Sequence, residues 1–417
     1  MKSYLFKTAV FLIVLMIALS TSPVYADDTL TKEMDTKPRL SLDAAIDAAI
    51  DHSDILGLDE KEIDYRDEIN DIKGKIDENP QLIGKVELEI PENKKELDED
   101  IERAQLRQAE QKKDFDQDRI IQQTTTAYNN IVTSEMKMEL AEKDIEIKSR
   151  ELAISKLKMV KGIITEIDFN ASELKLEDLK TKFKASENAL SDAEYNFKDL
   201  TGKDIKNYTL DKDVQFDKFE IEGSVDSYID DVIDEYLKYN TLIVKLNKNY
   251  FNDENNEVDD VKDADLPKTS KPETVNGDDL DAYEEYERKL DQYYQERENY
   301  AFKLSTRLAY LNARLGTYEG ETNLKEIRKK YKEQLRAFYS ELTNVEGNIN
   351  LLKRNIKLSD AQLDIYKIKY ETGMITKVDY DDQLLNNENL SIQLRDTINI
   401  YNTLKAQIEK PWTVFVK

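Results

Sequence analysis

The sequence matches itself at a spacing of 211 residues, and this internal repeat restricts the fold more than any other feature. Residues 162–168 read Gly-Ile-Ile-Thr-Glu-Ile-Asp, and residues 373–379 read Gly-Met-Ile-Thr-Lys-Val-Asp. A match of seven residues gains weight when its flanks keep the same spacing. Both flanks do so, which indicates a duplicated unit.

The flank before each copy carries apolar residues at every seventh position. Such rows are typical of helices that pack in a left-handed coiled coil. A second row falls on a well-separated side of the same helix, since successive residues turn by about 100°. Each long helix therefore needs neighbours on two sides. The first row is Ile131, Met138, Ile145, Leu152 and Met159, repeated as Leu342, Ile349, Ile356, Leu363 and Tyr370, and the second is Leu140, Ile147 and Ile154, repeated as Leu351, Leu358 and Ile365.

Each Gly-x-Ile-Thr segment is interpreted as a turn between two antiparallel helices. Gly162 and Gly373 suit the left-handed position just after a helix end. Thr165 and Thr376 suit N-caps, and an acid three residues after each would complete a capping box. This local turn chemistry explains the motif without any function. The two acids are Asp168 and Asp379, and the helices that follow carry the rows Phe169, Leu176, Phe183, Leu190 and Phe197, and Tyr380, Leu394, Tyr401 and Ile408, the latter interrupted by Asn387.

A second match, at a spacing of 187 residues, aligns the starts of the two halves, from Leu42 with Ile229 to Leu56 with Ile243. The two spacings differ by 24 residues, so the second half must contain an insertion of that length. The acidic stretch 252–281, which contains two prolines and a glycine, is its natural place. Its composition predicts a disordered loop.

We therefore predict an all-α fold of two tandem long antiparallel coiled-coil hairpins, with at most a minor β element near 84–90. The helix 324–372 alone would be on the order of 75 Å long, and one hairpin cannot bury both apolar rows by itself. Neighbours from the other repeat and from other copies of the chain are implied. The repeats span 27–215 and 216–417. In the first repeat, helices are expected at 41–77 and 94–161, followed by a return helix that ends at 199. In the second repeat, helices are expected at 225–250, 280–315, 324–372 and 377–408.

Residues 1–26 have the features of a secretory signal peptide, which predicts an exported chain. Lys2 and Lys7 precede an apolar run from residue 9 to 19, and a small-residue site ends at Ala26. The run is shorter than the roughly 20 residues of a membrane-spanning helix. The absence of cysteine rules out a lipid-attachment cysteine, disulfides and thiolate metal sites.

The formal charge of −26 disfavours nucleic acid and anionic membrane surfaces as partners. The excess of acidic residues is explained by their role in keeping the chain soluble. The alternative explanation is a passage that selects cations. The sequence offers few side chains suited to catalysis. It has one histidine, His52, which is interpreted as structural, and it has no phosphate-binding or zinc-protease motif. The acidic run 253–265 lacks the glycine and terminal glutamate of a calcium loop. We expect no enzyme, no catalytic residue, no metal and no cofactor.

Taken together, the export signal, the two repeats, the opening segment 40–53 and the segment 370–379 resemble TolC-type outer-membrane efflux proteins. The resemblance implies a homotrimer whose twelve-helix barrel forms a tunnel. It also implies that the hairpin tips meet a membrane-fusion adaptor, which serves an inner-membrane pump of the ABC or RND type. The adaptor-facing tip residues would then be Gly162, Ile163, Ile164, Thr165, Gly373, Met374, Ile375 and Thr376.

In that family, inward-facing acids and a tyrosine constrict the tunnel near the tips. The resemblance assigns the acid ring to Asp379 and Asp382, the tyrosine to Tyr370 and the partner of the tyrosine to Asp168. Because the chain has 87 acids, an ordinary solvated or capping role is the alternative for each aspartate, and packing in the heptad row is the alternative for Tyr370. Family protomers also supply four strands to an outer-membrane barrel. Here only residues 84–90 alternate as a strand would, which marks a divergent member with a reduced barrel region.

We therefore expect an efflux or export conduit that passes small molecules or polypeptides from an adaptor and pump across the cell envelope. It would lie in the outer membrane if the host has one, and would otherwise be associated with the cell wall. The alternative is a coiled-coil structural or interaction protein of the wall or envelope that forms no pore. An adaptor subunit is disfavoured, because the sequence has no glycine-rich, strand-rich segment for the adaptor domains.

Overall fold

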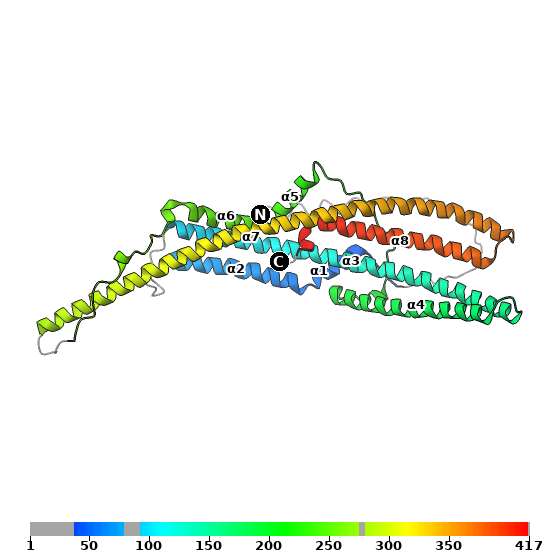
Figure 1. The fold of residues 1–417 in the computed structure, drawn as a ribbon, viewed down its shortest axis with the longest axis horizontal. Coiled ribbons are helices and arrows are strands. Elements are labelled where there is room, and N and C mark those ends of the chain that lie inside the picture. The colour runs from blue at the N-terminus through cyan, green and yellow to red at the C-terminus, as the bar shows by residue number, and fades with distance from the viewer. Residues whose placement is uncertain (1–36, 79–91, 275–279, 416–417) are drawn as a thin grey trace, which may run out of the picture. The chain divides into compact units, whose positions relative to one another are not determined.

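The computed structural model describes residues 37–78, 92–274 and 280–415. The chain divides into the units Met1–Pro38 and Arg39–Lys417, and the second is described here. The all-α fold is confirmed: long helices pair as antiparallel hairpins, and the strands among the described residues form one short parallel pair, β1 (Arg39–Leu40) and β2 (Thr209–Leu210) (Figure 1). The signal peptide and the strand expected at 84–90 lie outside the described residues.

The first repeat begins with two helices that meet at His52 and Ser53. Ser41 starts the first helix as an N-cap, its hydroxyl accepting from the Ala44 amide at 3.2 Å. The Ser53 hydroxyl accepts from the Leu56 amide at 3.3 Å and so starts a second helix, because a capped start satisfies an amide that the first turn leaves unpaired. The single helix expected over 41–77 is therefore two. The helices of this repeat are α1 (Leu42–Asp51), α2 (Asp54–Glu78), α3 (Glu92–Val160), α4 (Glu166–Thr201) and the 3-10 turn η2 (Ile205–Asn207).

The second repeat contains one very long helix, α7 (Leu280–Glu371), where two helices were expected. Gly316 and Gly320 do not break it. A glycine inside a helix costs about 1 kcal/mol, and packing of α7 against neighbouring helices, such as Val244 beside Gly320, offsets this cost. At 1.5 Å per residue α7 is about 140 Å long. The other elements are α5 (Val225–Tyr236), α6 (Lys238–Asn252), η3 (Glu254–Asn256), η4 (Asp263–Asp265), α8 (Lys377–Glu409) and η5 (Pro411–Thr413).

Residues separated by 211 positions occupy matching places in the two hairpin cores. Ile131 and Phe197 are fully buried between α3 and α4, and their counterparts Leu342 and Ile408 are buried between α7 and α8. The first apolar row therefore holds each hairpin together.

Residues 253–274 of the insert lie along the N-terminal half of α7 and are called the strap (Figure 1). Glu296 of α7 accepts hydrogen bonds from the Lys268 amide at 3.0 Å, the Thr269 amide at 2.9 Å and the Thr269 hydroxyl at 2.6 Å. Lys303 pairs with Asp265 at 2.7 Å. The sequence predicts disorder for this segment because its composition shows no partner, whereas the partners are polar groups of α7.

Replacing Glu296 with Ala is expected to release the strap. The hydrogen bonds from Thr269 and its neighbours lower the pKa of Glu296 from its ordinary value of 4.5 to about 2. Since this pKa is depressed in the folded chain, the attachment is fully present above pH 4.5 and is lost as the pH falls toward 2. Limited proteolysis of the strap at pH 7 should accelerate at least about 10-fold in the variant. Glu298→Ala, at an exposed position of the same helix, should leave the rate unchanged, and equal rates for the two variants would contradict the prediction.

Candidate functional site

The two hairpin turns have the same geometry, as the repeat predicts. Gly162 and Gly373 adopt φ values of 68° and 74°, in the left-handed region that glycine tolerates without strain. The amide after each glycine closes the helix end: Ile163 donates to the Lys158 carbonyl at 2.9 Å, and Met374 to the Lys369 carbonyl at 2.8 Å. Both left-handed turns are confirmed.

The capping boxes that begin α4 and α8 are also confirmed. The Thr165 hydroxyl accepts from the Asp168 amide at 3.1 Å, and the Asp168 carboxylate accepts from the Thr165 amide at 3.1 Å. Thr376 and Asp379 repeat this arrangement at 3.2 and 2.9 Å. The bonds from each threonine lower the pKa of its aspartate. Both aspartates are therefore charged acceptors within their own turns at neutral pH.

The tips leave large apolar side chains exposed. Ile163 is 66% exposed and Met374 is 75% exposed, whereas the next residues, Ile164 and Ile375, are half-buried. Neighbouring apolar side chains on the adjoining helix ends extend the surface. They are Val160 and Ile167.

The four residues expected at a constriction have different surroundings in one copy of the chain. The Tyr370 ring stacks on that of Tyr380, with centroids 5.5 Å apart, and the Asp382 carboxylate accepts from the Lys148 amine of α3 at 3.1 Å. Asp168 and Asp379 are occupied by their capping boxes. Within the described part of one chain, no hydrogen bond joins Tyr370 to Asp168.

The first hairpin contacts the second where α3 lies beside α8, and ion pairs border this contact. Lys143 pairs with Glu388 at 2.7 Å and Lys148 with Asp382 at 3.1 Å. At about 100° per residue, Ile147 lies between the two lysines on the helix surface, so the second apolar row of α3 is centred on the contact. Ile147 is accordingly 4% exposed. Two further pairs are Lys137 with Asp396 and Arg150 with Asp381.

The row of α8 that faces α3 also recurs every seven residues, a feature that the sequence analysis missed. Its central residue, Ile392, is 5% exposed, and the Asn399 amide donates to Thr133 of α3 at 3.3 Å. A comparison of α8 with α4 at the 211-residue spacing would have revealed it. The row is Val378, Leu385, Ile392, Asn399 and Ala406.

The repeat counterparts of both rows are exposed to solvent. On α7, Leu351, Leu358 and Ile365 are 49%, 60% and 52% exposed. On α4, the counterparts include Ile167 and Leu174, which are 79% and 67% exposed. The chain therefore has two open surfaces that correspond to the two sides of its own α3 and α8 contact.

Nearer the start of each repeat, a second contact inside the chain also has repeat counterparts that are exposed to solvent. Helix α3 also packs beside α6, where Gln108 donates to Asn240 at 3.0 Å. The counterparts of α3 and α6 are α7 and α2, and each exposes a heptad-spaced seam. The seam of α7 is Leu304, Leu308, Leu311, Leu315 and Tyr318, and that of α2 is Ile55, Leu58, Tyr65, Ile69 and Ile72.

We call the exposed row of α7 (Leu351, Leu358 and Ile365) together with the α7 seam the α7 edge. The exposed row of α4 (Ile167 and Leu174) together with the α2 seam is called the α2/α4 edge. Ion-pair partners also have counterparts on the two edges. The counterparts of Lys143 and Glu388 are Arg354 on α7 and Glu177 on α4, both exposed and of the same charges as the original pair. The two edges are therefore complementary in apolar rows and in this charge pair.

His52, the one histidine, ends α1, and its ring lies beside Gly202, where an added Cβ would lie 3.4 Å from Nδ1. Among the described residues, no helix has the length and apolar character needed to cross a membrane. The same residues contain no cluster of three side chains that could ligate a metal ion.

No protein-family model and no curated protein matches this sequence. Solved structures of outer-membrane channels do match in fold. The Campylobacter jejuni outer membrane channel CmeC is 13% identical with a TM-score of 0.54, covering 95% of this chain and 94% of CmeC. A structure of CusC is 9% identical with a TM-score of 0.56, over 94% and 99%. The outer-membrane channel OprN is 13% identical with a TM-score of 0.54, over 94% and 99%.

These matches extend over nearly the whole of each chain. At such low identity they show the fold, which is that of TolC-type outer-membrane efflux channels.

Proposed function

We propose that three copies of this chain close head to tail into a helical conduit for export across the cell envelope. The observation that carries this proposal is the pair of open edges. Each edge exposes an apolar row whose repeat counterpart packs inside the chain, as the 60% exposure of Leu358 shows by comparison with the 4% exposure of Ile147. The contact of α3 with α8 is therefore a template for the contact of α7 with α4 of the next copy.

The two edges differ from one another, so the contact between copies is heterologous. Heterologous contacts build a ring when the rotation closes and an open filament when it does not. The in-chain contact places two hairpins side by side, and repeating it between copies continues the same wall. The number three comes from the family resemblance of the sequence and is supported by the shared fold.

The hairpin tips are the proposed contact for a membrane-fusion adaptor, which would connect the conduit to an inner-membrane pump of the ABC or RND type. Ile163 and Met374 support this role, because each tip exposes a large apolar side chain and exposed apolar surface marks interaction sites. The rigid capped turns hold these side chains in place. Residues 1–26 would direct export of the chain, and the conduit itself would catalyse no reaction.

Light scattering of the purified protein at micromolar concentration tests the assembly. The mass of a trimer, near three times 48.6 kDa before removal of a signal peptide, is expected. A monomer at every concentration would refute the conduit. Planar bilayer recordings then separate the two readings, since conductance supports the conduit, whereas trimers without conductance support the structural protein of the wall or envelope.

If channels are recorded, the change of Asp379 and Asp382 to Asn is expected to lower cation preference, because rings of acids select cations. The cation-to-anion permeability ratio should fall by about 2-fold or more. Asp364→Asn, at an exposed position of α7 outside the proposed ring, is the control with the same change of charge. An unchanged ratio in the double variant would reject the acid ring.

A further inference from the structure

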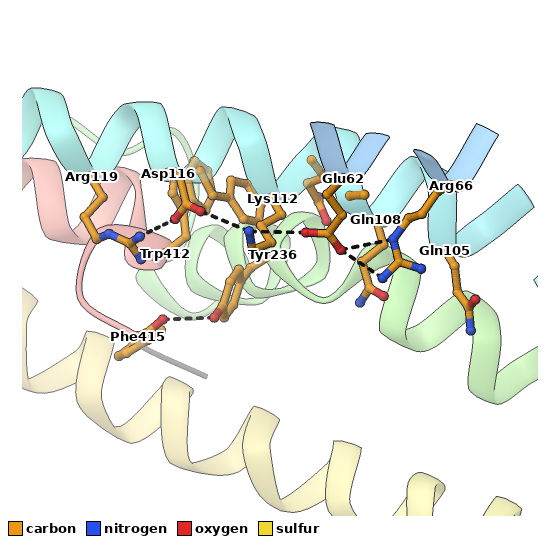
Figure 2. Close-up of a pocket in the computed structure, with 13 residues that line it drawn as sticks. Glu62, Arg66, Gln105, Gln108, Lys112, Asp116, Arg119, Tyr236, Trp412 and Phe415 are labelled. Carbon is orange, nitrogen blue, oxygen red and sulfur yellow. Dashed lines mark hydrogen bonds and ion pairs between the residues drawn. The ribbon is translucent and has the colours of Figure 1, made fainter. Parts of the chain in front are cut away.

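A pocket of about 360 Å³ lies between α2, α3, the end of α5 and η5 (Figure 2). Its volume falls in the range of small-molecule sites in proteins. Four elements from both repeats contribute to it, so the pocket forms only when the whole chain is folded.

Aromatic side chains form one wall of this pocket. The rings of Phe115 and Trp412 are stacked, with centroids 4.3 Å apart and planes inclined by 17°. The ring of Tyr236 lies 5.5 Å from that of Phe115, and its hydroxyl donates to the Phe415 carbonyl at 3.1 Å. A flat apolar group could pack on this wall, since aromatic rings favour stacked or edge contacts.

The rest of the lining is mostly polar or charged, and among its charged residues the cations outnumber the carboxylates. The charged lining residues are three cations, Arg66, Lys112 and Arg119, and two carboxylates, Glu62 and Asp116, although the whole chain carries −26. Glu62 is held by Arg66 at 2.8 Å, and Asp116 by Arg119 at 2.5 Å. Lys112 lies between these pairs, with Asp116 at 3.4 Å and Glu62 at 3.7 Å (Figure 2).

The cations keep donor capacity that the carboxylates do not exhaust. Arg66 uses Nε and Nη2 for Glu62, and its guanidinium has further N–H groups. The Arg66 and Lys112 side chains are 42% and 49% exposed, so a ligand can reach them. Lys112 also pairs with the buried Asp59 behind the pocket, which balances one positive charge. Burial raises the pKa of Asp116 from its ordinary value. The further N–H groups of Arg66 are the donors that a ligand can use.

We propose that this pocket binds a small amphipathic anion, with a flat apolar body against Phe115 and Trp412 and a carboxylate against Arg66 and Lys112. The planar fork of an arginine matches a carboxylate in two parallel hydrogen bonds. Figure 2 shows Lys112 between Arg66 and the aromatic residues Tyr236 and Trp412, so one ligand can reach both parts. The site lies within one copy of the chain, so its test does not depend on assembly.

Trp412 reports on the pocket directly, because it is the single tryptophan of the chain. The full-length protein is titrated with three probes that share one body and differ in head charge: 3-phenylpropionate, 3-phenylpropan-1-ol and 3-phenylpropylamine. The acid should change the tryptophan fluorescence saturably, with a dissociation constant on the order of 0.1 to 1 mM for so small a ligand. The alcohol should bind at least about 10-fold more weakly, and the amine more weakly still.

Arg66→Gln should weaken binding of the acid about 10-fold while the alcohol is unaffected. Arg107→Gln, which removes an exposed arginine of α3 outside the pocket, is the matched control and should bind as the parent does. The absence of a saturable change with the acid overturns the proposal. Binding of the amine as tight as that of the acid, or equal acid binding by the two variants, also overturns it.

Discussion

Replacing Arg354 with Glu is expected to abolish assembly of the conduit, and adding Glu177→Arg is expected to restore it. The single change places two acids opposite one another where α7 meets α4 of the next copy. Like charges facing each other across an interface cost several kcal/mol, and every contact of a ring contains the clash. The trimer fraction at micromolar protein should therefore fall by about 100-fold or more at low salt.

This prediction rests on the in-chain pair of Lys143 and Glu388, which are 2.7 Å apart and partly exposed. One such pair is worth about 1 kcal/mol or less, so neutralising Arg354 alone should have only a small effect. Sedimentation of the four charge combinations separates repulsion from loss of attraction. Lys367→Glu makes the same charge change about 180° around α7 from Leu358 and should leave the trimer intact. A double variant that stays monomeric would exclude the proposed pairing.

Replacing Arg395 with Met should strongly destabilise the folded protomer. Arg395 is 5% exposed and joins α8 to α3 and to the segment that follows β2. It donates to the Lys212 carbonyl at 2.8 Å, to the Thr133 hydroxyl at 2.7 Å and to the Asn129 carbonyl and side-chain oxygen at 3.2 and 3.1 Å. Burial lowers the pKa of this guanidinium, which nevertheless stays charged near neutral pH because arginine titrates so high.

Met would remove every hydrogen bond that Arg395 donates, and a polar group left unpaired in a buried place costs about 1 to 3 kcal/mol. We expect the free energy of unfolding to fall by about 3 kcal/mol in total, measured from urea unfolding curves. Lys at this position should recover only part of the loss, because an ammonium group lacks the planar fork. Arg336→Met breaks the exposed pair with Asp226 and should cost no more than about 1 kcal/mol. Equal losses for Arg395→Met and Arg336→Met would contradict the role of Arg395.

The sequence predicted features that depend on residues a few positions apart. The turns at Gly162 and Gly373 and the caps at Thr165 and Thr376 are local, since each satisfies its own helix end. The all-α hairpins follow from heptad rows that any partner helix must cover.

Features with partners far apart in the sequence were missed. Arg395 looks like any charged residue of a helix, and its acceptors Asn129 and Thr133 lie in the other repeat. The strap is acidic and proline-containing, and its composition gives no sign of the hydrogen bond between the Thr269 amide and Glu296, 27 residues away. The pocket combines Arg66 with Trp412, and no periodicity connects those positions.

The sequence by itself determined that each long helix carries two apolar rows and needs neighbours on two sides. It could not determine which row stays open, because Ile147 and Leu358 occupy equivalent positions of the repeat. Only the tertiary structure decides this. Helix α8 covers Ile147, whereas no hairpin among the described residues covers Leu358, which is 60% exposed. The physical reason is that a chain of two repeats can make one contact between its hairpins, and the equivalent contact must come from another copy.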